Sequence, residues 1–167
     1  MAAENFNMNP LLDKRLINAF IEGVVKTLST MAQTEITTGK PTVETSFKPK
    51  GDIAGLVGMV AGSMKGTMSI SYTKEGIFTI LENMLGEKYT DINDSVADGV
   101  GELTNMIYGT AKTTLNKLGY AFEMAIPTVI RGTFTISKYH SGATLVIPFN
   151  LKSGQTFYVE ITVQQGQ

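Results

Sequence analysis

Residues 94–120, DSVADGVGELTNMIYGTAKTTLNKLGY, decide the fold because they predict one long helix, at about 92–119, with two unlike faces. At about 100° per residue, one side of this helix is an apolar stripe. The stripe contains Val96, Val100, Leu103, Ile107, Ala111 and Leu118. Roughly the opposite side carries Asp98, Glu102, Asn105 and Gly109. A stripe of this length fixes the helix against a core, so the opposite face points away from the fold.

The outward face of this helix is unusual in its glycines as well as its polar residues. Gly99, Gly101 and Gly109 each cost up to about 1 kcal/mol relative to alanine inside a helix. We expect a steric use to offset that cost, namely the close approach of another surface to the helix backbone. The acids and the amide are spaced by four and then three residues, which places them together within about two turns. An exposed Glu or Asn usually meets only water, so the local pattern leaves both a docking face and an ordinary solvated face open.

Two further helices are predicted before this one. The first spans residues 10–32, with Asn9 as its N-cap and Pro10 at its first position. The second is shorter, follows Thr73 as N-cap and is closed by Gly86. Both carry apolar residues at helical spacing, which indicates that each packs one face on a core.

Alternating or continuous apolar patterns predict six strands, and residues 33–41 are predicted to be a loop. The strands are expected around 42–47, 52–61, 67–72, 134–136, 145–149 and 157–163. Gly62 and Ser63 form the expected hairpin turn, and Pro148, which lacks an N–H, places its strand at an edge or near its end. Strands in hairpins and helices in separate blocks indicate an α+β fold: an antiparallel sheet of about six strands, with two long helices and one shorter helix packed on one face.

Composition excludes several classes of function. The 167 residues suit one domain, and 14 basic against 15 acidic residues give no general attraction to nucleic acid or anionic membranes. Cysteine is absent and His140 is the single histidine, so thiol chemistry, histidine triads and protein-held metal sites are not expected. The sequence predicts neither a signal peptide nor a membrane span, and we expect a cytoplasmic protein with a flexible leader at 1–9 and one domain at 10–167.

The pattern Asp98-x3-Glu102-x2-Asn105, with Pro127 22 positions after the asparagine, resembles the signature of the CheC/CheX/FliY phosphatases of bacterial chemotaxis. The resemblance covers about residues 10–163, in the same order of helices and strands. It implies that the chain hydrolyses the aspartyl phosphate of the response regulator CheY. The regulator would then supply Mg²⁺ and a phosphoryl-binding lysine, so no cofactor is expected in this chain.

Within that family, CheC-type members carry the E-x-x-N motif on both long helices. The first helix here reads Glu22-Gly-Val-Val25, with valine where the amide should be. One complete site is therefore expected, which is more similar to CheX than to CheC or FliY. CheX relatives form homodimers by joining sheets edge to edge, and the resemblance implies the same here.

The resemblance also implies a role for each residue of the outward face. Asn105 would place a water in line with the phosphorus, and Glu102 would pair with the partner's lysine. Asp98 would support this arrangement or contact the partner, with Gly101 and Gly109 letting the partner approach. Two alternatives remain open from the sequence: a non-catalytic signalling or flagellar module that docks through the same face, and a structural oligomer in which E-x-x-N is incidental.

Overall fold

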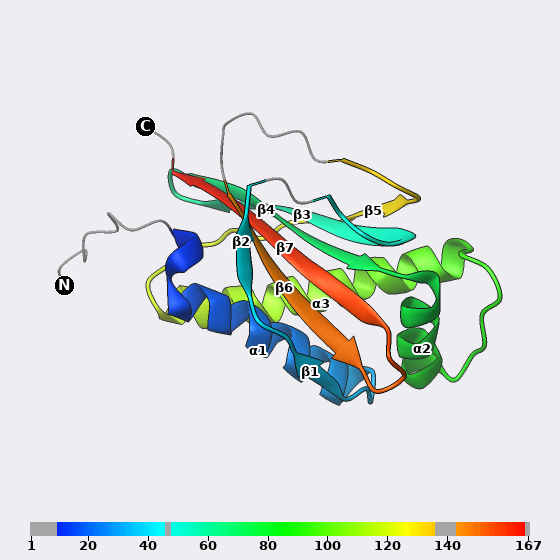
Figure 1. Ribbon diagram of the computed structural model, residues 1–167. Coiled ribbons are helices and arrows are strands. Elements are labelled where there is room, and N and C mark those ends of the chain that lie inside the picture. The colour runs from blue at the N-terminus through cyan, green and yellow to red at the C-terminus, as the bar shows by residue number, and fades with distance from the viewer. Residues whose placement is uncertain (1–9, 46–47, 136–142, 166–167) are drawn as a thin grey trace.

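A twisted antiparallel sheet forms one layer of the protein, and helices α1 and α3 form the other (Figure 1). The structure is a computed structural model that describes residues 10–45, 48–135 and 143–165. The helical elements are η1 (Pro10–Leu12), α1 (Lys14–Met31), α2 (Lys74–Leu85) and α3 (Asp94–Lys117). The strands are β1 (Ile36–Thr38), β2 (Thr42–Glu44), β3 (Ile53–Ala61), β4 (Met64–Tyr72), β5 (Thr128–Arg131), β6 (Thr144–Leu151) and β7 (Thr156–Gln165).

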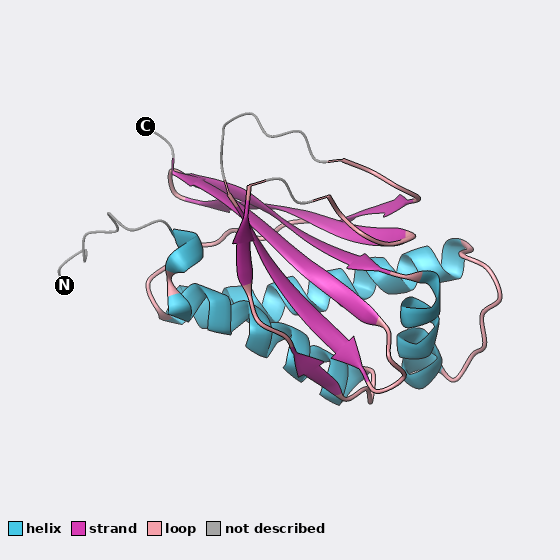
Figure 2. Ribbon diagram, in the orientation of Figure 1, coloured by secondary structure: helices cyan, strands magenta, loops and turns pink. Residues whose placement is uncertain are grey.

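The strand order across the sheet is β1-β6-β7-β4-β3-β5, and β2 pairs with β6 beside β1. Every pairing is antiparallel. Figure 2 shows α1 and α3 beneath the strands, with α2 at one end of the sheet. The predicted α+β class, an antiparallel sheet with two long helices and one shorter helix, is confirmed. The two long helices cover one face and α2 packs against α3 at one end (Figure 2), and the sheet has seven strands rather than six.

Helix α3 begins and ends within two residues of its predicted bounds. Asn93 is its N-cap, and its side chain accepts a hydrogen bond from the Val96 N–H at 3.0 Å. The predicted stripe is buried from Val96 to Ala111, but its last member was wrong, because Leu118 is the C-cap and is 40% exposed. Leu115 closes the buried stripe instead.

The hairpin β3–β4 brings the sheet close to α3. Gly62 and Ser63 form its turn as predicted, and Gly62 has φ 62°, a left-handed conformation that glycine adopts without strain. A Cβ at Gly55 of β3 would lie only 1.8 Å from the Thr104 hydroxyl oxygen of α3. The glycine-rich strand is therefore crossed closely by a helix.

The bounds of α2 are confirmed, whereas the predicted start of α1 was wrong. Thr73 accepts a hydrogen bond from the Gly76 N–H, and Gly86 ends α2 in the left-handed conformation. Pro10 starts a 3₁₀ turn, and α1 begins later because Asp13 caps it by accepting from the Arg15 N–H at 2.9 Å. The predicted N-cap, Asn9, lies outside the described residues, as does the predicted leader at 1–9.

Strands β1 and β6 correct two predictions. Residues 36–38, predicted as loop, form β1 and pair with β6. Strand β6 is consequently an inner strand, and Pro148 lies where β1 ends and β2 has not begun. The Gly39 N–H donates to the Pro148 carbonyl at 2.7 Å on this side of β6, so the missing N–H of the proline falls in the gap between two short strands.

The fourth predicted strand was misplaced. Strand β5 occupies residues 128–131 and pairs with β3, whereas Phe134 lies in a loop. The sequence of β5, TVIR, has two adjacent apolar residues and no alternation, so it gives little strand signal. Ile136 and His140 lie outside the described residues. Along the described residues, no helix combines the length and apolar character that a bilayer crossing requires.

Candidate functional site

The outward face of α3 presents Asp98, Glu102 and Asn105 to solvent, on the side of the helix opposite its buried stripe. All three side chains are exposed. None of them makes a hydrogen bond or ion pair with another described residue. Because no contact within the described structure uses them, their polar atoms are available there to a partner.

The opposite side of α3 holds this face rigidly in place. Thr104, next to Asn105 in the chain, is fully buried against Gly55 of β3. Its hydroxyl donates to the Val100 carbonyl at 2.7 Å within the helix. Glu102 and Asn105 therefore project from a helix whose neighbouring residues are anchored in the core.

The three glycines of α3 have different surroundings. A Cβ at Gly99 would lie 2.6 Å from a Leu81 methyl of α2, so this buried glycine serves packing within the chain. This corrects its prediction as part of an outward docking face. Gly101 is half-buried, and a Cβ there would meet Val129 of β5 at an ordinary 3.5 Å. Gly109 alone has open space where its Cβ would be.

A shallow groove of about 370 Å³ runs between α1 and α3 beside Asn105. Its α3 wall contains Met106, which follows Asn105 directly, and Gly109, one turn further on. Its α1 wall includes Lys26, an exposed residue. Sequence reasoning missed this contribution of α1, because the pairing of two helices depends on tertiary packing. The available sequence signal was Gly23, a glycine inside the predicted first helix. In the structure it lies where α1 crosses close to the α3 backbone.

Charges near the site are partly neutralised at the start of α3. The Arg131 guanidinium of β5 donates to the Asp94 carboxylate at 2.5 Å. Asp98 and Glu102, further along the helix, have no such cation within the described structure. On α1, Glu22 and Val25 are also exposed, but Val25 offers an apolar side chain where an amide would be required.

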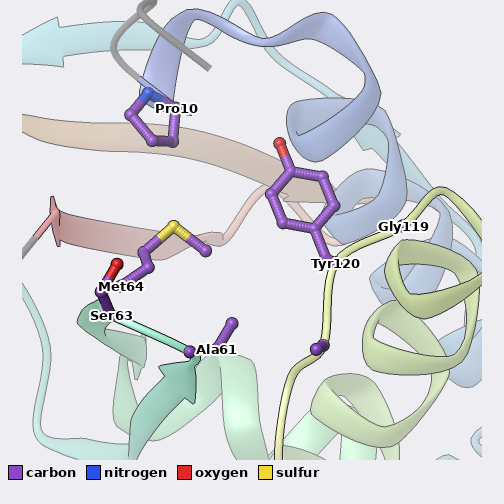
Figure 3. Close-up of a pocket in the computed structure, with 8 residues that line it drawn as sticks. Pro10, Ala61, Ser63, Met64, Gly119 and Tyr120 are labelled. Atoms are coloured by element: carbon purple, nitrogen blue, oxygen red, sulfur yellow. The ribbon is translucent and has the colours of Figure 1, made fainter. Parts of the chain in front are cut away.

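A cavity of about 320 Å³ lies near the end of α3, well away from this face. Figure 3 shows Tyr120 beside Pro10 and the hairpin residue Met64. The Tyr120 hydroxyl donates to the Asp13 carboxylate at 2.8 Å, so its polar end is already engaged. Tyr120 follows the C-terminal end of α3, whereas Asn105 lies near the middle of the helix. This cavity therefore does not belong to the candidate site.

The candidate site offers positioning groups rather than a metal centre. Among the described residues, no cluster of three His, Cys, Asp or Glu side chains could hold a metal ion. The face contains a neutral amide, two carboxylates and an open groove. Chemically, such a surface can bind a cationic group on a partner and orient a water molecule.

Comparison with known proteins defines the class of the chain. The family model described as chemotaxis phosphatase CheX matches residues 53–150, a region that contains all of α3. The CheY-P phosphatase CheX of Thermotoga maritima is 26% identical over 156 residues, which cover 93% of this chain and 99% of that protein. The fold, the outward face of α3 and this match together define a bacterial chemotaxis phosphatase architecture.

Solved structures agree with this class. A CheC-like superfamily protein from Shewanella sp. PV-4 is 40% identical, with a TM-score of 0.82 over 94% of this chain and 99% of that one. In the CheX–CheY–BeF₃–Mg²⁺ complex of Borrelia burgdorferi, the matched chain is 27% identical, with a TM-score of 0.76 over 90% of this chain and 98% of that one. The chain belongs to the CheX family of chemotaxis phosphatases.

Proposed function

We propose that this chain hydrolyses the aspartyl phosphate of a CheY-type response regulator and so ends a chemotaxis signal. The observation that carries the proposal is the exposed Glu102 and Asn105 pair on α3, which no described residue engages. Support comes from the Thermotoga relative, a CheY-P phosphatase, and from the Borrelia structure, in which a CheX protein is bound to CheY.

The chemistry of the substrate matches the small set of groups on α3. An acyl phosphate already has a good leaving group, and in this proposal the response regulator holds the Mg²⁺ and the lysine that bind the phosphoryl oxygens. What remains is to place a water in line with the phosphorus, which is mainly a problem of position. The face of α3 would supply that position without a metal or a nucleophile of its own.

In this proposal Asn105 positions the attacking water. Its amide can accept one hydrogen bond from the water and donate another, and it adds no negative charge beside a phosphate. A carboxylate at this place would repel the phosphoryl group. Because Asn105 projects from an anchored turn of α3, the water would already be positioned, and little further entropy would be lost on reaching the transition state.

Glu102 is assigned to docking, one turn before Asn105. Its exposed carboxylate would form a charge-assisted hydrogen bond with a lysine of the regulator, which fixes the register of the complex. Asp98 would extend the same acidic edge. Gly109 would let the regulator approach the helix backbone beside the α1–α3 groove. Gly101, which has no side chain, would let the regulator approach the helix on its β5 side.

The decay of phosphorylated CheY, timed with and without this protein, tests the proposal. Acceleration at sub-stoichiometric protein concentrations is expected of an enzyme. A non-catalytic docking module instead predicts binding to CheY with an unchanged rate of phosphate loss. A structural oligomer predicts neither binding nor acceleration, so the three functions give three different results.

We also propose that the chain forms a homodimer through a sheet edge. Strand β5 is a terminal strand of the sheet, so its outer backbone groups are unpaired in the described structure. Met124 and Ile126, just before β5, are 88% and 90% exposed, which is unusual for large apolar side chains. Pairing of two such edges would cover both features.

A further inference from the structure

A cavity with a basic lining lies on the face of the sheet opposite α1 and α3. Its volume is about 530 Å³, larger than the groove beside Asn105. Its basic side chains are those of Lys40, Lys48 and Lys50. Cavities of this size are in the range that accommodates small organic ligands.

The register of the sheet places the floor of this cavity. Thr42 of β2 pairs with Val146 of β6, and Pro148 of β6 pairs with Tyr158 of β7. Side chains alternate across a strand, and Ile147 belongs to the helix-facing core, so Val146 and Pro148 lie on the other face. The floor of the cavity consists of Val146, Pro148 and Tyr158. Val146 is buried, and Pro148 and Tyr158 are half-buried. The floor is therefore mainly apolar.

The lining is positively charged in a chain that is slightly acidic overall. Three of the 14 basic residues line this one cavity, and Glu44 is the acidic residue among the described lining, which leaves a net charge of +2. Within the described structure, none of the three lysines forms an ion pair. One carboxylate balances only one of the three ammonium groups, so the cavity favours an anion.

The lysines come from segments that border the floor on different sides. Lys40 follows Gly39, whose N–H is bonded to Pro148 of β6. Lys50 precedes β3, and its Nζ lies 5.9 Å from the centre of the Tyr158 ring. This cation–π contact holds one ammonium group directly above the floor. Positive charge therefore lies both beside Pro148 and above Tyr158 of the apolar surface.

We propose that this cavity binds a small soluble phosphate ester that has at least two negative charges and a flat apolar body. Lysine ammonium groups bind phosphate as point charges, and a planar ring of the ligand would lie on the floor formed by Val146, Pro148 and Tyr158. The cavity is on the other side of the sheet from Asn105, so its occupancy does not depend on the phosphatase proposal.

An NMR titration with adenosine monophosphate tests this site. Saturable shifts are expected at the amides of Thr42, Lys50 and Tyr158, with no shift at Asn105. Adenosine lacks the charge and pyrophosphate lacks the flat body, so each is expected to bind at least about fivefold more weakly. Pyrophosphate that binds as tightly as the nucleotide would overturn the role of the floor. The absence of saturable shifts up to about 10 mM nucleotide would overturn the site itself.

Charge variants complete the test. The variant K40Q/K48Q/K50Q is expected to bind the nucleotide at least about tenfold more weakly than the unchanged protein, with an undisturbed amide spectrum elsewhere. The matched control neutralises three exposed lysines outside the cavity, namely Lys65, Lys88 and Lys117. Equal affinity of the cavity variant and the control would contradict the proposal.

Discussion

Glu102 and Asn105 are neighbours on one helix turn, and we expect their loss to have different consequences. In the proposed mechanism the carboxylate would act on association with the regulator and the amide on the chemical step, because only the amide would touch the attacking water. Position on the helix alone does not distinguish the two roles. Kinetics of single variants can do so.

The variant Glu102→Lys is expected to weaken binding of CheY by at least about tenfold, because it places like charges together at the docking surface. The rate at saturating protein should change much less. Surface plasmon resonance with phosphorylated CheY measures the first quantity and quenched-flow assays the second. Glu82→Lys on α2, also an exposed glutamate, is the control. Unchanged affinity of the Glu102 variant would refute its docking role.

A different single residue controls the pH dependence of stability. Burial raises the pKa of the Glu160 carboxyl to about 8, against an ordinary value of 4.5, although the hydrogen bond from the Ser69 hydroxyl partly offsets this. Ser69 donates to one carboxylate oxygen at 2.5 Å, and the other oxygen has no hydrogen-bond partner among the described residues. The folded protein therefore favours the protonated acid.

The folded state binds more protons at Glu160 than the unfolded state between pH 4.5 and about 8. The contribution of Glu160 to the free energy of unfolding is therefore fully present below pH 4.5. It is lost as the pH rises from 4.5 to about 8, by up to about 1.4 kcal/mol per pH unit. Urea unfolding of Glu160→Gln should show a flatter pH dependence and higher stability than the unchanged protein at pH 9. A variant with the same pH slope would contradict burial as the cause.

At the scale of elements, some glycines permit close packing within the chain, whereas Gly109 leaves open space on the surface of α3. Gly109 faces open space in α3, so Gly109→Ala should raise stability by up to about 1 kcal/mol through helix propensity. The same change should weaken CheY binding, because the methyl group stands on the docking surface. Thermal unfolding and CheY binding, measured on the same preparation, check the expected rise in stability and the expected fall in affinity. Unaltered affinity would remove Gly109 from that surface.

Gly55→Ala is the contrasting variant for the packing between β3 and α3. A methyl group there would overlap the Thr104 hydroxyl, so the strand and helix must separate. Overpacking of this kind costs about 1–3 kcal/mol. The two alanine variants should thus shift the melting temperature in opposite directions.

Local patterns predicted the elements whose own residues carry the signal, such as α3, α2 and the β3–β4 hairpin. They failed where partner strands decide the structure. β1 is short and mostly polar, and forms because β6 offers it an edge. Pro148 is tolerated inside the sheet because two short strands leave a gap opposite it. Likewise, Gly99 and Gly109 look alike in sequence, and only the position of Leu81 shows that the first is a packing residue.

For the candidate site, the sequence supplied the three polar residues of α3 and the absence of a second amide on α1. It did not supply the α1 wall of the groove, because Lys26 acquires that place only when the helices pack. The spacing of residues along one helix is fixed by helix geometry, whereas the distance between two helices depends on the whole core.

At the scale of the whole molecule, the proposed homodimer depends on the edge that contains β5. Ile126→Asp would place a charge on each side of the paired edges and should convert a dimer into a monomer at micromolar concentration. Sedimentation equilibrium measures the change, with Leu85→Asp on α2, another exposed apolar residue, as control. A monomeric unchanged protein at that concentration would contradict the dimer.

The proposed phosphatase activity depends on one exposed amide, which would act on a partner's phosphate. Its most direct test is the single-turnover rate of phosphate loss from CheY, with Asn105→Ala present in excess and its affinity for beryllofluoride-treated CheY measured in parallel. We expect a rate at least about 100-fold below that of the unchanged protein, with affinity within about threefold. Asn18→Ala, an exposed asparagine on α1, should behave like the unchanged protein. An Asn105→Ala protein that still releases phosphate at the full rate would contradict the role of Asn105 in positioning the water.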